Sequence, residues 1–212
     1  MMSAPAPQEA PLLLACALGI ERRALRGGLR RGPAADVALL RTGMGPAAAR
    51  RAVAQRLRDT GLRTAPVLAT GFCAGLETGM RPGDVLVATT AQLDGERIDC
   101  HAPDLLAEAI GRLGHTVHRG TLAGSDHVVR PPERRALREG GAHAVDMESA
   151  AVLSEALRAG PRPVAAVRVV VDAPGHELIR IGTLRGGLRA YRVLSSVLPA
   201  FFQWHSTSLP RR

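Results

Sequence analysis

The sequence predicts an α/β fold, a three-layer α/β/α sandwich around a central mixed sheet. Short apolar runs that are typical of buried strands alternate with amphipathic stretches that are typical of helices, and turn residues separate them. The chain has 212 residues, a length that suits one compact domain with a single core. We therefore expect a disordered N-terminus over residues 1–10 and one domain over residues 11–212.

The expected elements follow one another in a regular order. Continuous apolar or β-branched runs predict strands at 12–18, 36–41, 66–70, 85–89, 117–123 and 164–171. Apolar residues at helical spacing predict helices after Glu21 and at 46–60, 105–113, 132–138, 149–157 and 184–198. The turn at 43–46 contains two glycines and places Pro46 in the first turn of its helix, where proline is well tolerated.

Composition excludes several classes of protein. Hydrophobic residues make up 46% and charged residues 22% of the chain, which is close to the globular average and unlike disordered or fibrous chains. No run of 18 uncharged apolar residues is present, and no basic segment precedes the first apolar run. The odd number of cysteines, three, favours reduced thiols. These observations predict a cytoplasmic protein.

The formal net charge is +9 and all 28 basic residues are arginine. They are spread along the chain and few aromatic residues accompany them, so we expect no nucleic-acid partner. The segment after Glu177 is different, because it has no acidic residue and holds Tyr191, Phe201, Phe202 and Trp204. Two interpretations stay open: a helix that closes the core, which we favour, and peripheral contact with an anionic membrane.

Acidic residues stand where predicted strands or helices begin and end. Glu21 follows the first strand, Glu148 precedes a helix, and Asp172 ends the most β-branched strand. Ligands of α/β sheets bind outside the carboxyl ends of strands, so these side chains are expected to converge on one pocket. Asp172 is the candidate general acid, since a desolvated carboxyl can hand a proton to a leaving group. The alternative for each is a helix cap or a surface carboxylate.

Other kinds of site are not expected. The turn at 43–48 matches a G-x-G-x-x-A phosphate loop, but it does not follow the first strand and lacks the acidic residue that dinucleotide binding requires. The histidines lack zinc spacing, and the chain has no G-x-S-x-G motif. We expect neither a metal nor a cofactor.

An ordered set of short motifs then points to a family. The set comprises Gly19-Ile20-Glu21, Thr42-Gly43-Met44-Gly45, Thr70-Gly71-Phe72-Cys73-Ala74-Gly75-Leu76, Pro82-Gly83-Asp84, Val145-Asp146-Met147-Glu148-Ser149-Ala150 and Arg168-Val169-Val170-Val171-Asp172. Together they resemble the purine nucleoside phosphorylase and nucleosidase superfamily, which includes methylthioadenosine/S-adenosylhomocysteine nucleosidase. Within it the chain is most similar to hopanoid-associated enzymes that release adenine from adenosylhopane.

The resemblance implies a nucleoside phosphorylase-like fold and a role for each matched residue. Asp172 matches the acid that protonates N7 of the leaving purine, and Glu21 matches the glutamate that activates water. Glu148 matches the carboxylate that holds the ribose hydroxyls, and Met147 the residue beneath the sugar. The remaining substrate-binding positions that it implies are Gly71, Phe72, Cys73, Val128 and Val129. It also implies a small-molecule nucleoside as the substrate and a homo-oligomer, a dimer or larger, in which a neighbour lines the pocket.

Two departures from the family pattern bear on the reaction. Ala69 and Phe72 stand where related phosphorylases have an arginine and a serine that bind phosphate, so we favour hydrolysis, although Arg22 or Arg23 offers a partial replacement. Phe72 and the aromatic C-terminus suggest a lipid tail on the ribose 5' position and membrane association. A phosphorylase, a methylthioadenosine/S-adenosylhomocysteine nucleosidase and a nucleoside-binding or membrane-peripheral module without turnover remain alternatives.

Overall fold

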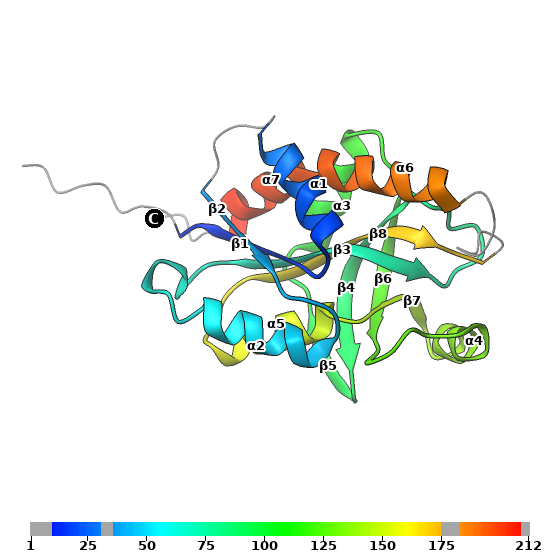
Figure 1. Cartoon of the computed structure of the whole chain (residues 1–212), viewed down its shortest axis with the longest axis horizontal. Coiled ribbons are helices and arrows are strands. Elements are labelled where there is room, and N and C mark those ends of the chain that lie inside the picture. Colours follow the sequence, from blue (N-terminus) through cyan, green and yellow to red (C-terminus); the bar gives the residue numbers. More distant parts are fainter. Residues whose placement is uncertain (1–9, 31–35, 175–182, 209–212) are drawn as a thin grey trace, which may run out of the picture.

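The computed structural model describes residues 10–30, 36–174 and 183–208. These residues form an eight-stranded mixed sheet with helices packed on both of its faces (Figure 1). The predicted α/β sandwich class is therefore confirmed. Residues 1–9, which make up nearly all of the expected disordered N-terminus, lie outside the described residues.

The elements begin and end as follows. The strands are β1 (Leu12–Cys16), β2 (Val37–Arg41), β3 (Val67–Gly75), β4 (Val85–Leu93), β5 (Glu96–Asp99), β6 (Val117–Gly124), β7 (Ala142–Asp146) and β8 (Val164–Asp172). The helices are α1 (Gly19–Leu29), α2 (Pro46–Arg56), the 3-10 turn η1 (Thr60–Leu62), α3 (Pro103–Arg112), α4 (Pro131–Glu139), α5 (Ser149–Arg158), α6 (Thr183–Ser196) and α7 (Leu198–Ser208).

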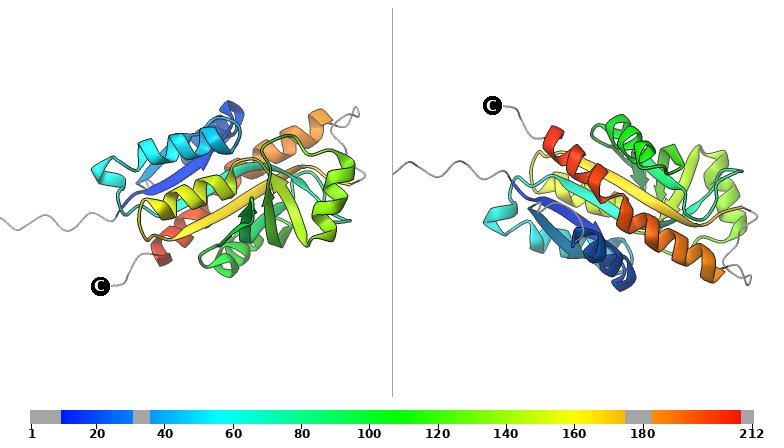
Figure 2. Two further views of the ribbon diagram at one scale, coloured as in Figure 1. Left: turned by 90° about the horizontal axis from the view of Figure 1, so that it is seen from below. Right: turned by 90° about the horizontal axis from the view of Figure 1, so that it is seen from above.

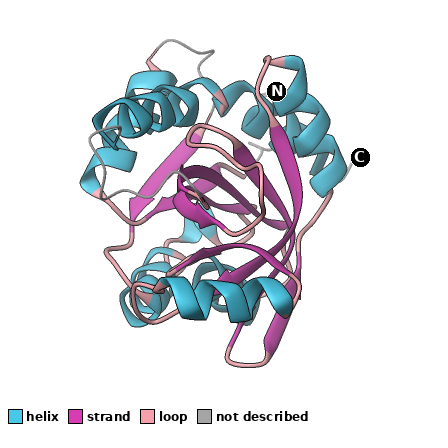
Figure 3. Ribbon diagram, turned by 90° about the vertical axis from the view of Figure 1, so that its right-hand side faces the viewer, coloured by secondary structure: helices cyan, strands magenta, loops and turns pink. Residues whose placement is uncertain are grey.

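The sheet folds back on itself at one side. The strand order is β2-β1-β3-β7-β6-β4-β5, and β8 pairs in parallel with β3 and antiparallel with β4. The pairings β3–β8, β8–β4, β4–β6, β6–β7 and β7–β3 therefore close a ring of five strands, which Figure 3 views from the right-hand side of Figure 1. The pairing of β3 with β8 shifts register between Cys73 and Ala74, and at Ala74 and Gly75 β3 also pairs with β7. This bend brings the carboxyl ends of β3, β7 and β8 together.

Two helix layers cover the sheet, as Figure 2 shows from above and below. On one face α2 and α5 pack with Leu13, Val67 and Val152 in a wholly buried cluster. On the other face α1, α3, α6 and α7 pack around Leu14 and Leu68. Successive residues of β1 and β3 point to opposite faces, so β1 is apolar throughout and β3 is apolar except for Thr70, as expected for a sheet that is buried on both sides.

The C-terminal aromatic residues belong mainly to the core. Phe201 and Trp204 are 0% exposed, and Tyr191 and Phe202 are partly buried against the same cluster. The Trp204 indole N–H also donates to the His101 carbonyl at 2.9 Å. The favoured interpretation, a helix that closes the core, is confirmed, and these side chains no longer argue for membrane contact. Among the described residues, no helix has both the length and the apolar character needed to cross a bilayer.

Several elements differ from the sequence expectation. The short strands β5 and β7 and the turn η1 were not predicted, and β3 and β4 continue to Gly75 and Leu93, beyond their predicted ends at residues 70 and 89. The last helix, expected over 184–198, is two helices that meet at Val197, two residues before Pro199. Proline removes a backbone donor and clashes with the preceding turn, so α7 begins with Leu198 at its first position and Pro199 at its second.

Candidate active site

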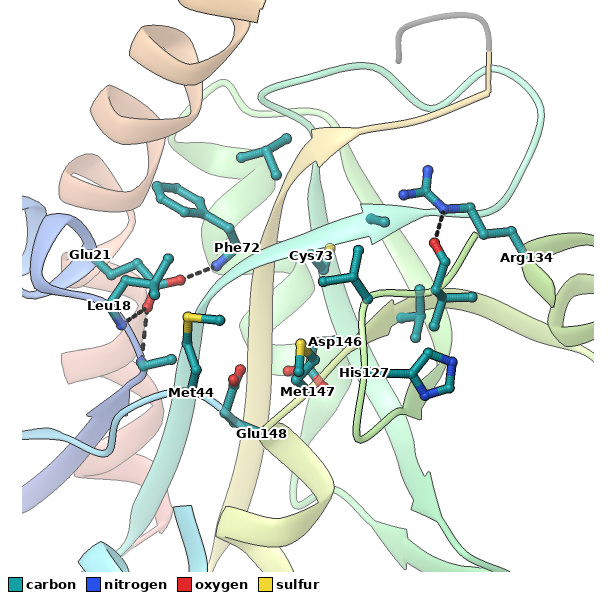
Figure 4. Close-up of a pocket in the computed structure, with 16 residues that line it drawn as sticks. Leu18, Glu21, Met44, Phe72, Cys73, His127, Arg134, Asp146, Met147 and Glu148 are labelled. Carbon is teal, nitrogen blue, oxygen red and sulfur yellow. Dashed lines mark hydrogen bonds between the residues drawn. The ribbon is translucent and has the colours of Figure 1, made fainter. Parts of the chain in front are cut away.

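A cavity of about 290 Å³ opens at the carboxyl ends of β1, β3, β7 and β8. We call it the central cavity. Figure 4 shows Glu21 and Arg134 at its opposite ends, with Glu148 and Met147 between them. Its lining is mainly apolar, with a few carboxylates, one arginine and one histidine, a composition that is typical of small-molecule sites.

Glu21 is fixed by backbone donors from two parts of the chain. It lies in the first turn of α1, 2% exposed. Its Oε2 accepts from the amides of Ala17 at 2.9 Å and Leu18 at 2.8 Å, and its Oε1 accepts from the amide of Phe72 at 2.8 Å. These three N–H donors fix the orientation of the Glu21 side chain. Glu21 is therefore a buried, oriented acceptor at the cavity wall.

Glu148 and Met147 lie at the start of α5, immediately after β7. The Glu148 side chain reaches the turn before α2, where its Oε1 accepts from the Gly45 amide at 2.9 Å. Glu148 is 7% exposed, and desolvation by burial raises the pKa of its carboxyl above the ordinary value, while Arg168 and the Gly45 amide partly oppose that shift. Both Met147 and Glu148 line the central cavity.

A buried ion pair lies next to these carboxylates, on the side of β8. Arg168 on β8 is 1% exposed, and its Nη2 lies 2.6 Å from Oδ2 of Asp146. Its Nε donates to Ser149 Oγ at 2.8 Å and its Nη1 to the Thr70 carbonyl at 3.1 Å. Asp146 also accepts from the Ser149 amide at 3.1 Å. With these hydrogen bonds the pair fixes the junction between β7, α5 and β8.

Gly71 lets this pair approach Glu21. A Cβ at Gly71 would overlap Glu21 Oε1 and lie 2.6 Å from Arg168 Nη1, and the backbone φ of +139° is one that L-residues rarely adopt. Gly71 thus packs behind the central cavity and does not line it. Its role is to make room for two charged groups.

Asp172 lies beside the central cavity and forms an ion pair with Arg134, which lines that cavity. Asp172 ends β8 at 6% exposure, and the lining includes its neighbour Val171 but not Asp172 itself. Arg134 on α4 lines the cavity; its Nη2 donates to Asp172 Oδ2 at 2.7 Å and its Nε to the Val129 carbonyl at 3.0 Å. The other oxygen, Oδ1, is buried and has no hydrogen-bond partner among the described residues.

Apart from His127, which contacts Asp126 and Glu133, the rest of the lining is apolar. Phe72, Cys73, Val128 and Val129 all line the central cavity, as does Met44 from the turn before α2. Val128 is 71% exposed and Met44 62% exposed. These two side chains form an apolar rim around the opening. Cys73, in contrast, is buried, and desolvation raises the pKa of its thiol, so it acts as a small apolar wall and not as a nucleophile.

The structure brings together residues that are far apart in the sequence. Of the nine predicted site residues, seven line the central cavity, namely Glu21, Phe72, Cys73, Val128, Val129, Met147 and Glu148, while Gly71 and Asp172 lie directly behind its lining. Sequence reasoning missed Met44, His127 and Arg134 in the lining and Arg168 behind it. Arg168 carried a signal, because a lone arginine inside an otherwise apolar strand needs a buried partner.

This arrangement can cleave a polar bond by acid and base chemistry. One end of the central cavity presents an oriented acceptor, the middle presents a buried carboxyl, and the other end adjoins an acid that is paired with arginine. Such carboxyl groups can deprotonate a nucleophile, bind hydroxyls or stabilise a cation, and protonate a leaving group.

Comparison with known proteins gives one family and a set of related folds. A model described as the phosphorylase superfamily matches residues 5–198. No curated protein sequence matches the chain.

Solved structures of nucleosidases have a similar fold. The 5'-methylthioadenosine/S-adenosylhomocysteine nucleosidase of Neisseria meningitidis, in complex with methylthio-immucillin-A, is 20% identical with a TM-score of 0.75 over 92% of this chain and 99% of that one. The futalosine hydrolase of Helicobacter pylori is 16% identical with a TM-score of 0.75 over 92% and 97%. A Streptococcus pneumoniae nucleosidase in complex with 8-aminoadenine is 19% identical with a TM-score of 0.71 over 90% and 99%. At these identities the likeness establishes the fold.

Proposed function

Because this chain belongs to the phosphorylase superfamily, we propose that it is a purine nucleosidase that cleaves the N-glycosidic bond of a 5'-modified adenosine. The observation that carries the proposal is that Glu21 and Glu148 face one cavity while Asp172 adjoins it through Arg134. N-glycoside cleavage needs three functions in one place: a nucleophile activator, a support for the sugar cation and an acid for the leaving base.

The chemistry divides among the three carboxyl groups. Glu21, held by three backbone amides, takes a proton from the attacking water. Glu148 accepts hydrogen bonds from the ribose hydroxyls above Met147. Asp172 gives its proton to N7 of the purine as the C–N bond breaks, and the products are adenine and a ribosyl compound. Asp172 must be protonated and released from Arg134 to do so.

We propose water as the nucleophile in preference to phosphate. Ala69 is wholly buried in β3, and the Phe72 ring lines the central cavity, so neither offers a donor to an anion there. Phosphate requires positively charged donors close to the attacked carbon. Phosphorolysis remains the alternative that the experiment must separate.

The apolar rim favours a substrate whose 5' substituent is apolar. Met44 and Val128 expose most of their side chains at the opening, and Ile20 is exposed to 52% next to Glu21. Such a rim stabilises an apolar group that emerges from the cavity. Together with the resemblance to hopanoid-associated enzymes, it favours adenosylhopane over substrates with small 5' groups, and an enzyme that meets such a lipid would work at a membrane surface.

The test measures adenine release by mass spectrometry from adenosylhopane, 5'-methylthioadenosine and S-adenosylhomocysteine, each with and without phosphate. We expect release without phosphate, with adenosylhopane as the preferred substrate. Strict dependence on phosphate would indicate a phosphorylase, and preference for a small 5' group would remove the lipid assignment.

The same assay tests the general acid. In the Asp172→Asn variant the amide cannot donate the required proton, so we expect adenine release to fall by about 10²–10⁴-fold, the usual contribution of general acid catalysis. Circular dichroism checks that the variant is folded. Near-normal turnover in the folded variant would refute the assignment.

A further inference from the structure

A second cavity of about 290 Å³ lies next to the central cavity, and three arginines of one helix line it. Arg134, Arg135 and Arg138 occupy neighbouring positions of α4, and Gly75, Leu76 and Ala173 belong to the opposite wall. We call it the arginine cavity. Arg134 is shared, because it lines both cavities.

We propose that the arginine cavity binds an oxyanion, a phosphate or carboxylate group, through the guanidinium groups of Arg134, Arg135 and Arg138. Guanidinium is a planar group with several N–H donors that matches phosphate and carboxylate oxygens in pairs. The inference does not depend on the proposed reaction, because it concerns a separate cavity.

The charge balance of the cavity favours an anion. Three positive side chains line it, and Asp172 is the one carboxylate that forms an ion pair with them within the described part of the chain. Like charges on one helical face repel one another unless a counter-charge is present. An oxyanion between the three guanidinium groups would offset that repulsion.

Arg134 keeps donors free for such a ligand. Its Nε donates to the Val129 carbonyl and its Nη2 to Asp172, which fixes the plane of the guanidinium group. A guanidinium group has five N–H donors, so within the described part of the chain three remain for a third partner, two on Nη1 and one on Nη2. A fixed side chain with spare donors loses little conformational freedom on binding.

The site differs from the place where a nucleophilic phosphate would bind. Glu21, the proposed activator of the nucleophile, lies at the far end of the central cavity from Arg134 (Figure 4), and no residue of β1 or α1 lines the arginine cavity. The proposed reaction places the base of a bound nucleoside, and not its 5' group, beside Asp172 and Arg134, so the ligand of the arginine cavity is a free anion.

The test is calorimetric titration of the full chain with inorganic phosphate, without nucleoside and at fixed ionic strength. The variant is Arg135→Gln/Arg138→Gln, which removes two of the three charges and leaves Arg134 and Asp172 in place. The control is Arg51→Gln/Arg58→Gln, which removes the same charge from exposed positions near α2. We expect saturable binding by the unmodified chain, binding at least tenfold weaker in the first variant, and no change in the control. Absence of saturable phosphate binding by the unmodified chain, or equal phosphate binding by the unmodified chain and Arg135→Gln/Arg138→Gln, would overturn the proposal and leave the proposed reaction untouched.

Discussion

Four carboxyl groups are buried in or beside the central cavity, and each is compensated by different partners. The four are Glu21, Asp146, Glu148 and Asp172. Backbone amides surround the first, buried Arg168 pairs with the second and partly exposed Arg134 with the last. Burying charged groups costs free energy unless hydrogen bonds or counter-charges offset it. Glu148, with one amide donor from Gly45, is the least compensated of the four.

This imbalance predicts a pH dependence of stability. Burial raises the pKa of Glu148, so the folded chain binds more protons than the unfolded chain between the ordinary value of 4.5 and the raised one. Stability from this group is therefore fully present below pH 4.5 and is lost as the pH rises through the folded pKa. In Glu148→Gln this loss should disappear.

Urea unfolding of both proteins between pH 4.5 and 8 measures the difference. We expect Glu148→Gln to gain stability relative to the unmodified chain as the pH increases, while its adenine release falls because ribose binding is lost. If the difference in stability grows toward low pH instead, the burial argument for Glu148 is wrong.

The sequence indicates these carboxyl groups because they stand at strand and helix ends, where ligands of α/β folds bind. It does not indicate their partners. In the sequence, Arg134 is indistinguishable from the solvated arginines of a basic helix. Its pairing with Asp172 follows only from the fold, which places α4 beside the end of β8. The pairing of Asp146 with Arg168 likewise depends on the return of β8 between β3 and β4.

At the scale of elements, β3 determines the geometry of the site. It pairs with β8 from Val67 to Ala74, with a register shift after Cys73, and at Ala74 and Gly75 it also pairs with β7. The bend presents Phe72 and Cys73 to the central cavity and places Gly71 against Glu21 and Arg168. A local irregularity in one strand thus brings groups from α1, β8 and α5 together.

Gly71→Ala tests this interpretation of β3. The new methyl group overlaps the Glu21 carboxylate and the backbone is strained at φ +139°, so Glu21 and Arg168 must move. We expect a loss of stability of about 1–3 kcal/mol and a loss of adenine release of at least about tenfold, the effect of some 1.4 kcal/mol at the transition state. Thermal unfolding and the adenine assay measure the two effects.

A matched control is Gly111→Ala in α3. A Cβ there has no atom within 4 Å, and alanine is the better helix former, so stability should stay the same or increase. Full activity in Gly71→Ala would show that Glu21 does not need its present position.

Element prediction succeeds where the signal is local. The apolar runs of β1, β3 and β8 and the proline at the start of α2 are visible in the sequence. In contrast, β7 (Ala142–Asp146) contains small residues and His143, and β5 is only four residues long. Such strands exist because of the neighbours they pair with, and strand propensity depends on that context.

At the scale of the whole molecule, the C-terminal helices complete one face of the core. The segment that is richest in arginine and aromatic residues looked suited to a membrane surface. Its largest side chains instead pack between the sheet and α3, with Phe201 and Trp204 wholly buried. A net charge of +9 therefore attracts anionic surfaces or ligands through the solvated arginines and not through these rings.

The last prediction separates two roles of α7, packing in the core and contact with a membrane. Phe201→Ala removes a wholly buried ring, so the free energy of unfolding should fall by about 3–5 kcal/mol. Gln203→Ala, an exposed neighbour on the same helix, should change it by less than about 0.5 kcal/mol. Trp204 is the single tryptophan of the chain and is buried beside His101, so its fluorescence reports unfolding in urea. A ring in the core must contribute to stability whether or not lipid is present. If Phe201→Ala leaves the stability unchanged but abolishes binding to anionic vesicles, the core assignment is wrong and α7 contacts the membrane.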